Sequence, residues 1–163
     1  IVIVIGKTEG HIDQSLFSRV ILDEKNGPPP EVNLFNEKNN GESLLSLIDK
    51  NYIKSAHDIS LGGLITALSK MCIKGNKGIK LKKVKNFLND IEYFFAEDQG
   101  RYIIEISPED LENVSKILDK NSVYHEEIGV ITDKDMIINE KTKVTIDELK
   151  SYNTNWLTNY MSS

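Results

Sequence analysis

The stretch at residues 54–71, KSAHDISLGGLITALSKM, constrains the fold more than any other part of the sequence. From Leu61 to Cys72, apolar residues recur at steps of three and four, the spacing of a helix with one apolar face. Ser60 is suited to cap this helix, because its hydroxyl can accept a bond from a free N–H group of the first turn. The stretch thus predicts a short strand at residues 55–58, a tight turn, and a helix over residues 62–73.

Two glycines, Gly62 and Gly63, fall in the first turn of this expected helix. Helix propensity argues against glycine there. What glycine offers at such a turn is a backbone without a side chain, which another chain segment or an anion can approach closely. One interpretation is a strand-to-helix turn packed against its own sheet. The other is a turn that faces a phosphate group, with Asp58 as a partner for a metal ion or a hydroxyl group.

Apolar periodicity predicts further elements along the chain. The expected helices are residues 13–22, 32–50, 86–93, 108–120 and a last helix from 147, and the expected strands are residues 1–5, 79–84, 102–106, 123–132, 136–139 and 143–146. Prolines 28–30 must separate the first two helices, because proline lacks the backbone N–H group. Helices and strands mix without strict alternation, which favours an α+β fold with one mixed sheet and flanking helices. We expect one domain over residues 1–163.

Composition excludes several classes of protein. The net charge of −5 argues against a nucleic-acid partner, and the lysine cluster at residues 74–85 contains no aromatic side chains. No apolar run approaches the roughly 20 residues that a membrane helix needs. Cys72 is the only cysteine, so a disulfide within the chain is impossible and a reducing cytoplasm is the expected compartment. The first residue is not methionine, and we expect the chain to be part of a longer protein.

A second polar stretch precedes the expected strand at residues 102–106. It gathers Glu97, Asp98, Gln99 and Arg101, and Arg101 is one of only two arginines in the chain. The carboxylates could coordinate a hydrated cation while the guanidinium group holds a phosphate. The alternative is a solvent-exposed turn with a local arginine–carboxylate pair.

A third polar stretch, at residues 6–15, follows the first expected strand. Thr8, His11, Gln14 and Ser15 lie in it, and loops beyond strand ends are frequent ligand sites. The three histidines of the chain are too scattered to indicate a metal site or a catalytic triad. We expect each of them to be a surface or hydrogen-bonded structural residue.

The order of these stretches carries a family resemblance. The chain has G-x-T-x-G-H-I-x-Q-S-L after a buried strand, then P-P-P-x-V-N-L, S-A-H-D-I-S-x-G-G-L and F-F-A-E-D-Q-G-R-Y. This order closely resembles the last domain of phosphoribosylformylglycinamidine synthase, in the synthetase subunit of the small bacterial type. Within that family the chain looks like the C-terminal domain of the second of two homologous halves. The implied fold is that of the aminoimidazole ribonucleotide synthetase superfamily.

The resemblance implies a function for the full-length protein. In that family, ATP and magnesium activate the amide of formylglycinamide ribonucleotide, and ammonia from glutamine then gives the amidine in purine synthesis. The implied partners are the N-terminal domains of the same chain, a glutaminase subunit and a small bridging subunit. Two residues depart from the family pattern: Asp13 replaces a usual glycine, and Leu61 replaces the acid of S-[DE]-G-G-L.

The candidate site follows from these motifs. Because the segments at 55–58 and 102–106 are both short and adjoin motif loops, we expect them to be neighbouring strands, so that residues 55–63 and 97–101 face one cleft. No catalytic residue is expected in this chain, and the isolated chain is expected to lack synthetase activity while it self-associates through exposed apolar surface. A free-standing nucleotide- or phosphate-binding regulatory module and a purely structural interface domain are the alternatives. The expected nucleotide- or phosphate-binding residues are His57, Asp58, Ser60, Gly62, Gly63, Gln99 and Arg101, and the expected metal ligands are Asp58 and Glu97.

Overall fold

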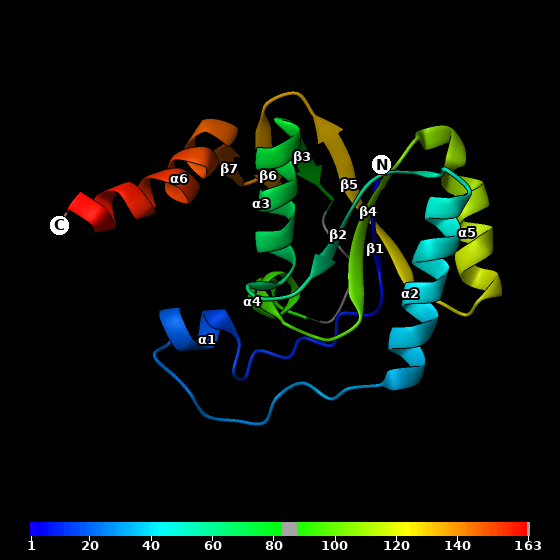
Figure 1. Ribbon diagram of the computed structural model, residues 1–163, viewed down its shortest axis with the longest axis horizontal. Coiled ribbons are helices and arrows are strands. Elements are labelled where there is room, and N and C mark those ends of the chain that lie inside the picture. Colours follow the sequence, from blue (N-terminus) through cyan, green and yellow to red (C-terminus); the bar gives the residue numbers. More distant parts are fainter. Residues whose placement is uncertain (83–87, 163) are drawn as a thin grey trace.

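The strands form one seven-stranded mixed sheet in the order β2-β4-β1-β5-β3-β6-β7 (Figure 1). The computed structural model describes residues 1–82 and 88–162. The strands are β1 (Val2–Ile5), β2 (Ile53–Ile59), β3 (Gly78–Leu81), β4 (Arg101–Ile106), β5 (His125–Thr132), β6 (Asp135–Ile138) and β7 (Thr142–Thr145). The helices are α1 (Leu16–Ile21), α2 (Leu34–Asp49), α3 (Gly63–Gly75), α4 (Asp90–Phe95), the short 3₁₀ helix η1 (Pro108–Asp110), α5 (Leu111–Lys120) and α6 (Ile146–Ser162).

The central strands are apolar on both faces. Along β1, Val2 and Val4 point to one side, whereas Ile3 and Ile5 point to the other, because successive side chains of a strand alternate. The first side packs against α3 and α4, and the second packs against α2 and α5. A strand covered on both faces explains the continuous β-branched run at the start of the sequence. The α+β fold class is therefore confirmed.

The first two helices differ in detail from what the sequence predicted. The expected helix at 13–22 begins only at Leu16, because Gln14 has a φ of 61° and Ser15 caps the helix by accepting the N–H of Ser18. The helix at 32–50 runs without a break across residues 39–41. Asn40 is buried there and donates its side-chain amide to the carbonyl of Gly100 at 2.9 Å, which compensates for its weak helix propensity.

The other described helices and strands begin and end within a few residues of the predicted positions. Parts of the expected strand at 79–84 and of the expected helix at 86–93 lie outside the described residues. The helix expected after Ser107 starts as η1, and the Ser107 side chain makes no capping hydrogen bond. Within residues 1–82 and 88–162, no helix combines the length and apolar character required to cross a membrane.

Candidate functional site

The motif at residues 55–58 and the strand after residues 97–101 are neighbours in the sheet. β2 pairs antiparallel with β4, and Asp58 stands opposite Tyr102 while Ile59 stands opposite Arg101. The sequence-based expectation that these two segments lie side by side is therefore confirmed. The end of β2 and the start of α3 are thereby brought to the start of β4.

The turn into α3 differs from the expected cap. Gly62 is the N-cap residue with a φ of 84°, and Gly63 follows with a φ of 69°. Ser60 accepts the N–H of Gly63 through its backbone carbonyl at 2.9 Å, so the prediction that its side chain caps the helix was wrong. Both glycines adopt backbone angles that other residues rarely take, because a Cβ atom would be crowded there.

Gly63 also permits a close contact between two helices. A Cβ atom on Gly63 would lie 2.7 Å from the carbonyl carbon of Phe95 and 2.8 Å from the carbonyl oxygen of Ala96. The bare backbone at this turn therefore accommodates the end of α4. Of the two interpretations of the glycine pair, this contact favours the packed turn.

Glu97 occupies the position at which an anion would approach the start of α3. Its Oε1 atom accepts the N–H of Gly62 at 2.8 Å and the N–H of Leu16 at 2.7 Å. One carboxylate thus satisfies free N–H groups at the beginnings of α1 and α3, where negative charge is stabilising. The same oxygen atom is consequently engaged inside the protein.

Asp98 is a second internal anion. Its Oδ2 atom accepts the N–H groups of Glu9 and Gly10 at 2.9 and 3.1 Å, and its Oδ1 atom accepts that of His11 at 3.1 Å. Three successive backbone N–H groups that point at one anion resemble the cradles that bind phosphate. Here the protein's own carboxylate fills that cradle and anchors the loop at residues 6–15.

Arg101 lies in the interior, with 1% of its surface exposed. Its guanidinium donates to the carbonyls of Ala96 at 2.6 Å and Asp98 at 3.2 Å, and to the hydroxyl of Thr8 at 3.0 Å. Burial lowers its pKa, and the Asp98 carboxylate, 3.9 Å from Nη2, opposes that shift. Arg101 is therefore paired with Asp98 rather than with Asp58 or Glu97, and it is not an exposed clamp for a phosphate.

The remaining expected ligands do not converge on one cleft. His57 and Ser55 line a pocket of about 600 Å³, whereas Gln99 and Asp98 line another of about 560 Å³. The side chain of Asp58 is 63% exposed and pairs with His57. The expectation of one cleft shared by residues 55–63 and 97–101 thus does not match these two pockets.

The expected metal ligands do not fit a magnesium ion. Glu97 is occupied by two backbone N–H groups, and Asp58 faces solvent from the edge strand β2. In the described part of the chain, no three His, Cys, Asp or Glu side chains form a group that could hold a metal ion. The nucleotide-binding roles of the motif residues therefore remain a prediction.

The third polar stretch closes a loop. His11 Nε2 lies 2.9 Å from the carbonyl oxygen of Pro28, and the Gln14 amide donates to the carbonyl of Lys25 at 2.7 Å. These bonds tie residues 11–14 to the proline-rich segment. His11 has the hydrogen-bonded structural role expected for it.

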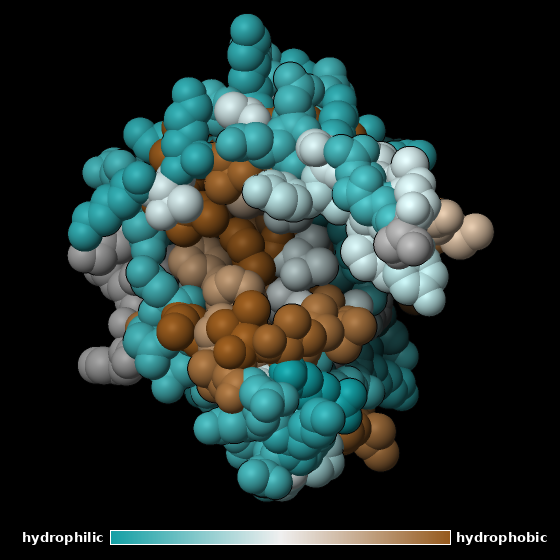
Figure 2. Space-filling model, turned by 90° about the vertical axis from the view of Figure 1, so that its left-hand side faces the viewer, coloured by the Kyte–Doolittle hydropathy of each residue, from teal (hydrophilic) through white to brown (hydrophobic). Residues whose placement is uncertain are grey.

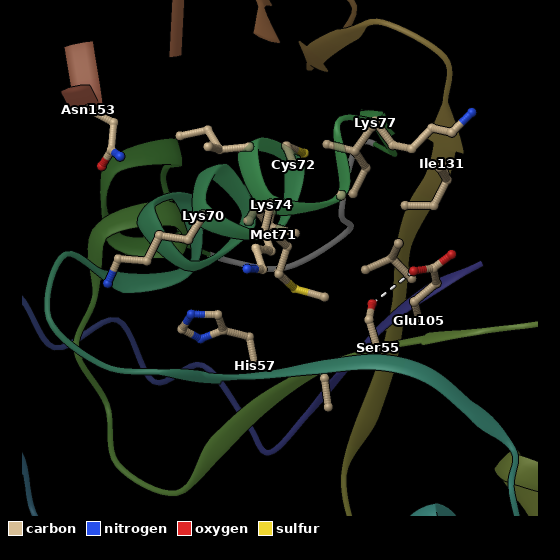
Figure 3. Close-up of a pocket in the computed structure, with 16 residues that line it drawn as sticks. Ser55, His57, Lys70, Met71, Cys72, Lys74, Lys77, Glu105, Ile131 and Asn153 are labelled. Atoms are coloured by element: carbon tan, nitrogen blue, oxygen red, sulfur yellow. Dashed lines mark hydrogen bonds between the residues drawn. The ribbon is translucent and has the colours of Figure 1, made fainter. Parts of the chain in front are cut away.

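The pocket of about 600 Å³ was not anticipated from the sequence. It lies between β2 and the second half of α3, and Lys70, Lys74 and Glu105 are among its lining residues (Figure 3). One signal was present in the sequence: Glu105 interrupts the otherwise apolar run at residues 103–106. Strand alternation places it on the same face as Ile103, which packs against α3.

The family model and the curated relatives of this chain agree on one family. Residues 1–139 match the family described as AIR synthase related protein, C-terminal domain. The chain is 67% identical over 163 residues to the phosphoribosylformylglycinamidine synthase subunit PurL of Pelagibacter ubique, and 34% identical over 163 residues to that of Bartonella bacilliformis. It covers 22% of each, so it spans about a fifth of the length of these curated relatives.

Solved structures show the same fold. A structure of Thermotoga maritima PurL complexed with FGAR has a TM-score of 0.74 at 20% identity, over 91% of this chain and 27% of that chain. The hydrogenase maturation protein HypE of Escherichia coli has a TM-score of 0.62 at 16% identity, over 89% of this chain and 48% of that chain. Since the family model matches residues 1–139 of the 163, the chain belongs to the family of AIR synthase related protein C-terminal domains.

Proposed function

We propose that residues 1–163 are the C-terminal domain of the synthetase subunit of a phosphoribosylformylglycinamidine synthase. The observation that carries this proposal is the 67% identity to the Pelagibacter ubique subunit, which extends over all 163 residues of the chain. Identity of 34% to the subunit of Bartonella bacilliformis over the same length supports the same assignment.

The full-length protein would then be an ATP-dependent carbon–nitrogen ligase. It would convert formylglycinamide ribonucleotide to formylglycinamidine ribonucleotide, with glutamine as the source of ammonia and with magnesium as the metal ion. Structures of Thermotoga maritima PurL complexed with ATP and with FGAR support the proposal that the full-length protein uses ATP and this substrate. The main nucleotide site would lie on N-terminal domains of the same subunit.

Within this ligase, the domain would contribute structure rather than chemistry. The charged groups of residues 97–101 already have partners in the protein: Glu97 accepts N–H groups from two helix starts, Asp98 accepts those of a backbone cradle, and Arg101 donates to three oxygen atoms. A nucleotide would have to displace these bonds. We therefore infer that this half retains the motif as internal packing.

The partners and the compartment follow from the same assignment. A glutaminase subunit and a small bridging subunit would complete the synthase, as the structure of PurLQS from Thermotoga maritima suggests for that enzyme. The cytoplasm is the proposed compartment. The chain's single cysteine, Cys72, is a free buried thiol, as is usual for proteins of a reducing compartment.

Domain replacement tests the proposal. The matching segment of the Pelagibacter ubique subunit would be exchanged for this chain, and glutamine- and ATP-dependent formation of the amidine would be measured with the partner subunits present. We expect activity close to that of the parent enzyme. A control exchange with the corresponding domain of Escherichia coli HypE, which has the same fold, should be inactive. A folded, soluble exchange enzyme without activity would contradict the assignment.

A further inference from the structure

The pocket between β2 and α3 has the size and composition of a small-molecule site. Its volume of about 600 Å³ lies within the range of roughly 300–1,000 Å³ typical of ligand sites. Its apolar lining includes Val2, Met71, Ile79 and Ile131. Such a surface favours a flat or extended apolar body, since removing it from water is stabilising.

One end of the pocket carries an acceptor. Figure 3 shows Ser55 and Glu105 together at this end, where the Ser55 hydroxyl donates to Glu105 Oε2 at 2.8 Å. This is the one hydrogen bond to the carboxylate from another side chain in the described part of the chain. A carboxylate on the core-facing side of a strand is costly unless donors satisfy its oxygens. Glu105 can therefore accept an ammonium or N–H group from a ligand.

Cations also line the pocket. In Figure 3 the His57 ring and the Lys70 side chain both extend into the gap between β2 and α3, away from Ser55 and Glu105, and Lys74 lies one helical turn after Lys70, beside Met71. Lys77 is already paired with Asp133 at 2.9 Å, but Lys70 and Lys74 have no ion-pair partner among residues 1–82 and 88–162. These two ammonium groups can receive an anion.

His57 has a defined orientation in this group. Its Nδ1 atom lies 2.6 Å from the carbonyl oxygen of Asp58, and a carbonyl oxygen can only accept, so Nδ1 carries a proton. Nε2 is left as the ring atom for the pocket. It can accept a proton from a ligand or, when the ring is protonated, donate to an anion.

We propose that this pocket binds a small bipolar molecule: an apolar body with an anionic group for Lys70 and Lys74 and an ammonium or N–H group for Glu105. Separated charges of opposite sign select against a simple fatty acid, because its tail would end at a carboxylate. They also select against a simple amine, which would meet the lysines. This site is independent of the proposed ligase function and of the motif residues 97–101.

Methyl NMR of the purified protein tests the proposal. The chain has three methionines, of which Met71 lines the pocket, Met136 is buried in the core and Met161 is exposed on α6. The probes are 4-(aminomethyl)benzoate, which carries both charges, and benzoate and benzylamine, which carry one each. We expect the bipolar probe to shift the Met71 signal saturably and to leave the Met161 signal in place.

Matched variants separate the two ends of the site. Because a charge-assisted hydrogen bond is lost, Glu105→Gln should lower the affinity for the bipolar probe about tenfold, to the affinity measured for benzoate. The double variant Lys70→Gln/Lys74→Gln should lower the affinity for the bipolar probe to that measured for benzylamine. Lys38→Gln, on α2 at the opposite face of the sheet, should have no effect.

Two results would overturn the proposal. One is that no probe shifts Met71 saturably at millimolar concentration while thermal melting shows the protein to be folded. The other is that the bipolar probe binds no more tightly than benzoate and benzylamine, or binds equally well to the Glu105 and lysine variants. Either result would assign the pocket to protein packing.

Discussion

The Oε1 atom of Glu97 lies 2.8 Å from the backbone nitrogen of Gly62, so the polar stretch before β4 caps the helix that follows β2. The same oxygen also accepts the N–H of Leu16. A single side chain thus joins three segments that are distant in the sequence. The candidate phosphate site is, in this geometry, a junction held by internal carboxylates.

Removal of this junction should destabilise the protein. Glu97→Ala leaves two helix-start N–H groups without their acceptor, and we expect the free energy of unfolding to fall by about 1–3 kcal/mol. Glu97→Gln should lower the free energy of unfolding less, since its amide oxygen can still accept hydrogen bonds from these N–H groups. Urea unfolding measures both. Glu112→Ala, which removes an exposed pair with Lys116, is the control and should change little. Equal stability of Glu97→Ala and the wild type would contradict the capping role.

Gly63 should tolerate no side chain. Gly63→Ala combines a φ of 69° with Cβ contacts below 3 Å to the end of α4, and it should cost about 3 kcal/mol or more. Gly41→Ala is the matched control, because Gly41 lies inside α2 and its nearest neighbour would be 3.6 Å away. We expect that control to stabilise the protein by about 0.5–1 kcal/mol. Thermal melting compares the two, and a harmless Gly63→Ala would disprove the close packing.

The sequence predicted the fold and one relationship within the candidate site. Apolar periodicity located the strands, and the short segments β2 and β4 were expected to be neighbours because each is flanked by a motif. The sequence could not show that Glu97 and Asp98 turn inward. Most of their partners, Leu16 and residues 9–11, lie more than 80 positions away, and only the folded chain brings them close.

The pocket between β2 and α3 escaped prediction for a similar reason. Its cations come from a helix and its carboxylate from a strand that pairs with β2. The exposed lysines of α3 look like a solvated face in the sequence. Only the packing of α3 over part of the sheet brings Lys70 and His57 to the same pocket.

Glu126 should give the protein a measurable pH dependence. Burial raises its pKa above the ordinary carboxyl value of 4.5, and the hydrogen bond from the Tyr93 hydroxyl at 3.3 Å opposes that shift. Because the folded state holds this proton more tightly, the group's contribution to stability is present below pH 4.5 and is lost as the pH rises through the folded pKa.

Comparison with Glu126→Gln isolates this contribution. The stability of the wild type minus that of the variant should fall as the pH increases from below 4.5 through the folded pKa, and it should level off above that pKa. Denaturant unfolding across this range provides the measurement. A difference that stays constant with pH, or that grows, would rule out the raised pKa as its source.

Exposed apolar side chains should cause self-association. Val20 and Ile21 on α1 are 67% and 66% exposed, and Trp156 on α6 is 66% exposed. Figure 2 shows apolar surface gathered around a hollow on the side of the molecule where α1 and α6 lie in Figure 1. Such a patch marks an interaction surface. Sedimentation equilibrium should show an average mass that rises with concentration.

Variants at this surface provide the control for self-association. Val20→Ser together with Ile21→Ser should reduce it, because both side chains are already largely exposed and their loss leaves the core intact. Leu45→Ser, on the exposed face of α2, should not. A constant mass of 18.5 kDa at every concentration would count against an interaction surface in this domain.

Calorimetric titration of the purified chain with ATP, in the presence and absence of magnesium, tests the central claim most directly. If Glu97, Asp98 and Arg101 serve as internal packing, neither condition should give saturable binding, and no ATP-dependent phosphate release should exceed a matched blank. Saturable, magnesium-dependent binding of ATP that Arg101→Lys weakens, while Lys38→Gln does not, would contradict the claim and restore a nucleotide site to this half of the protein.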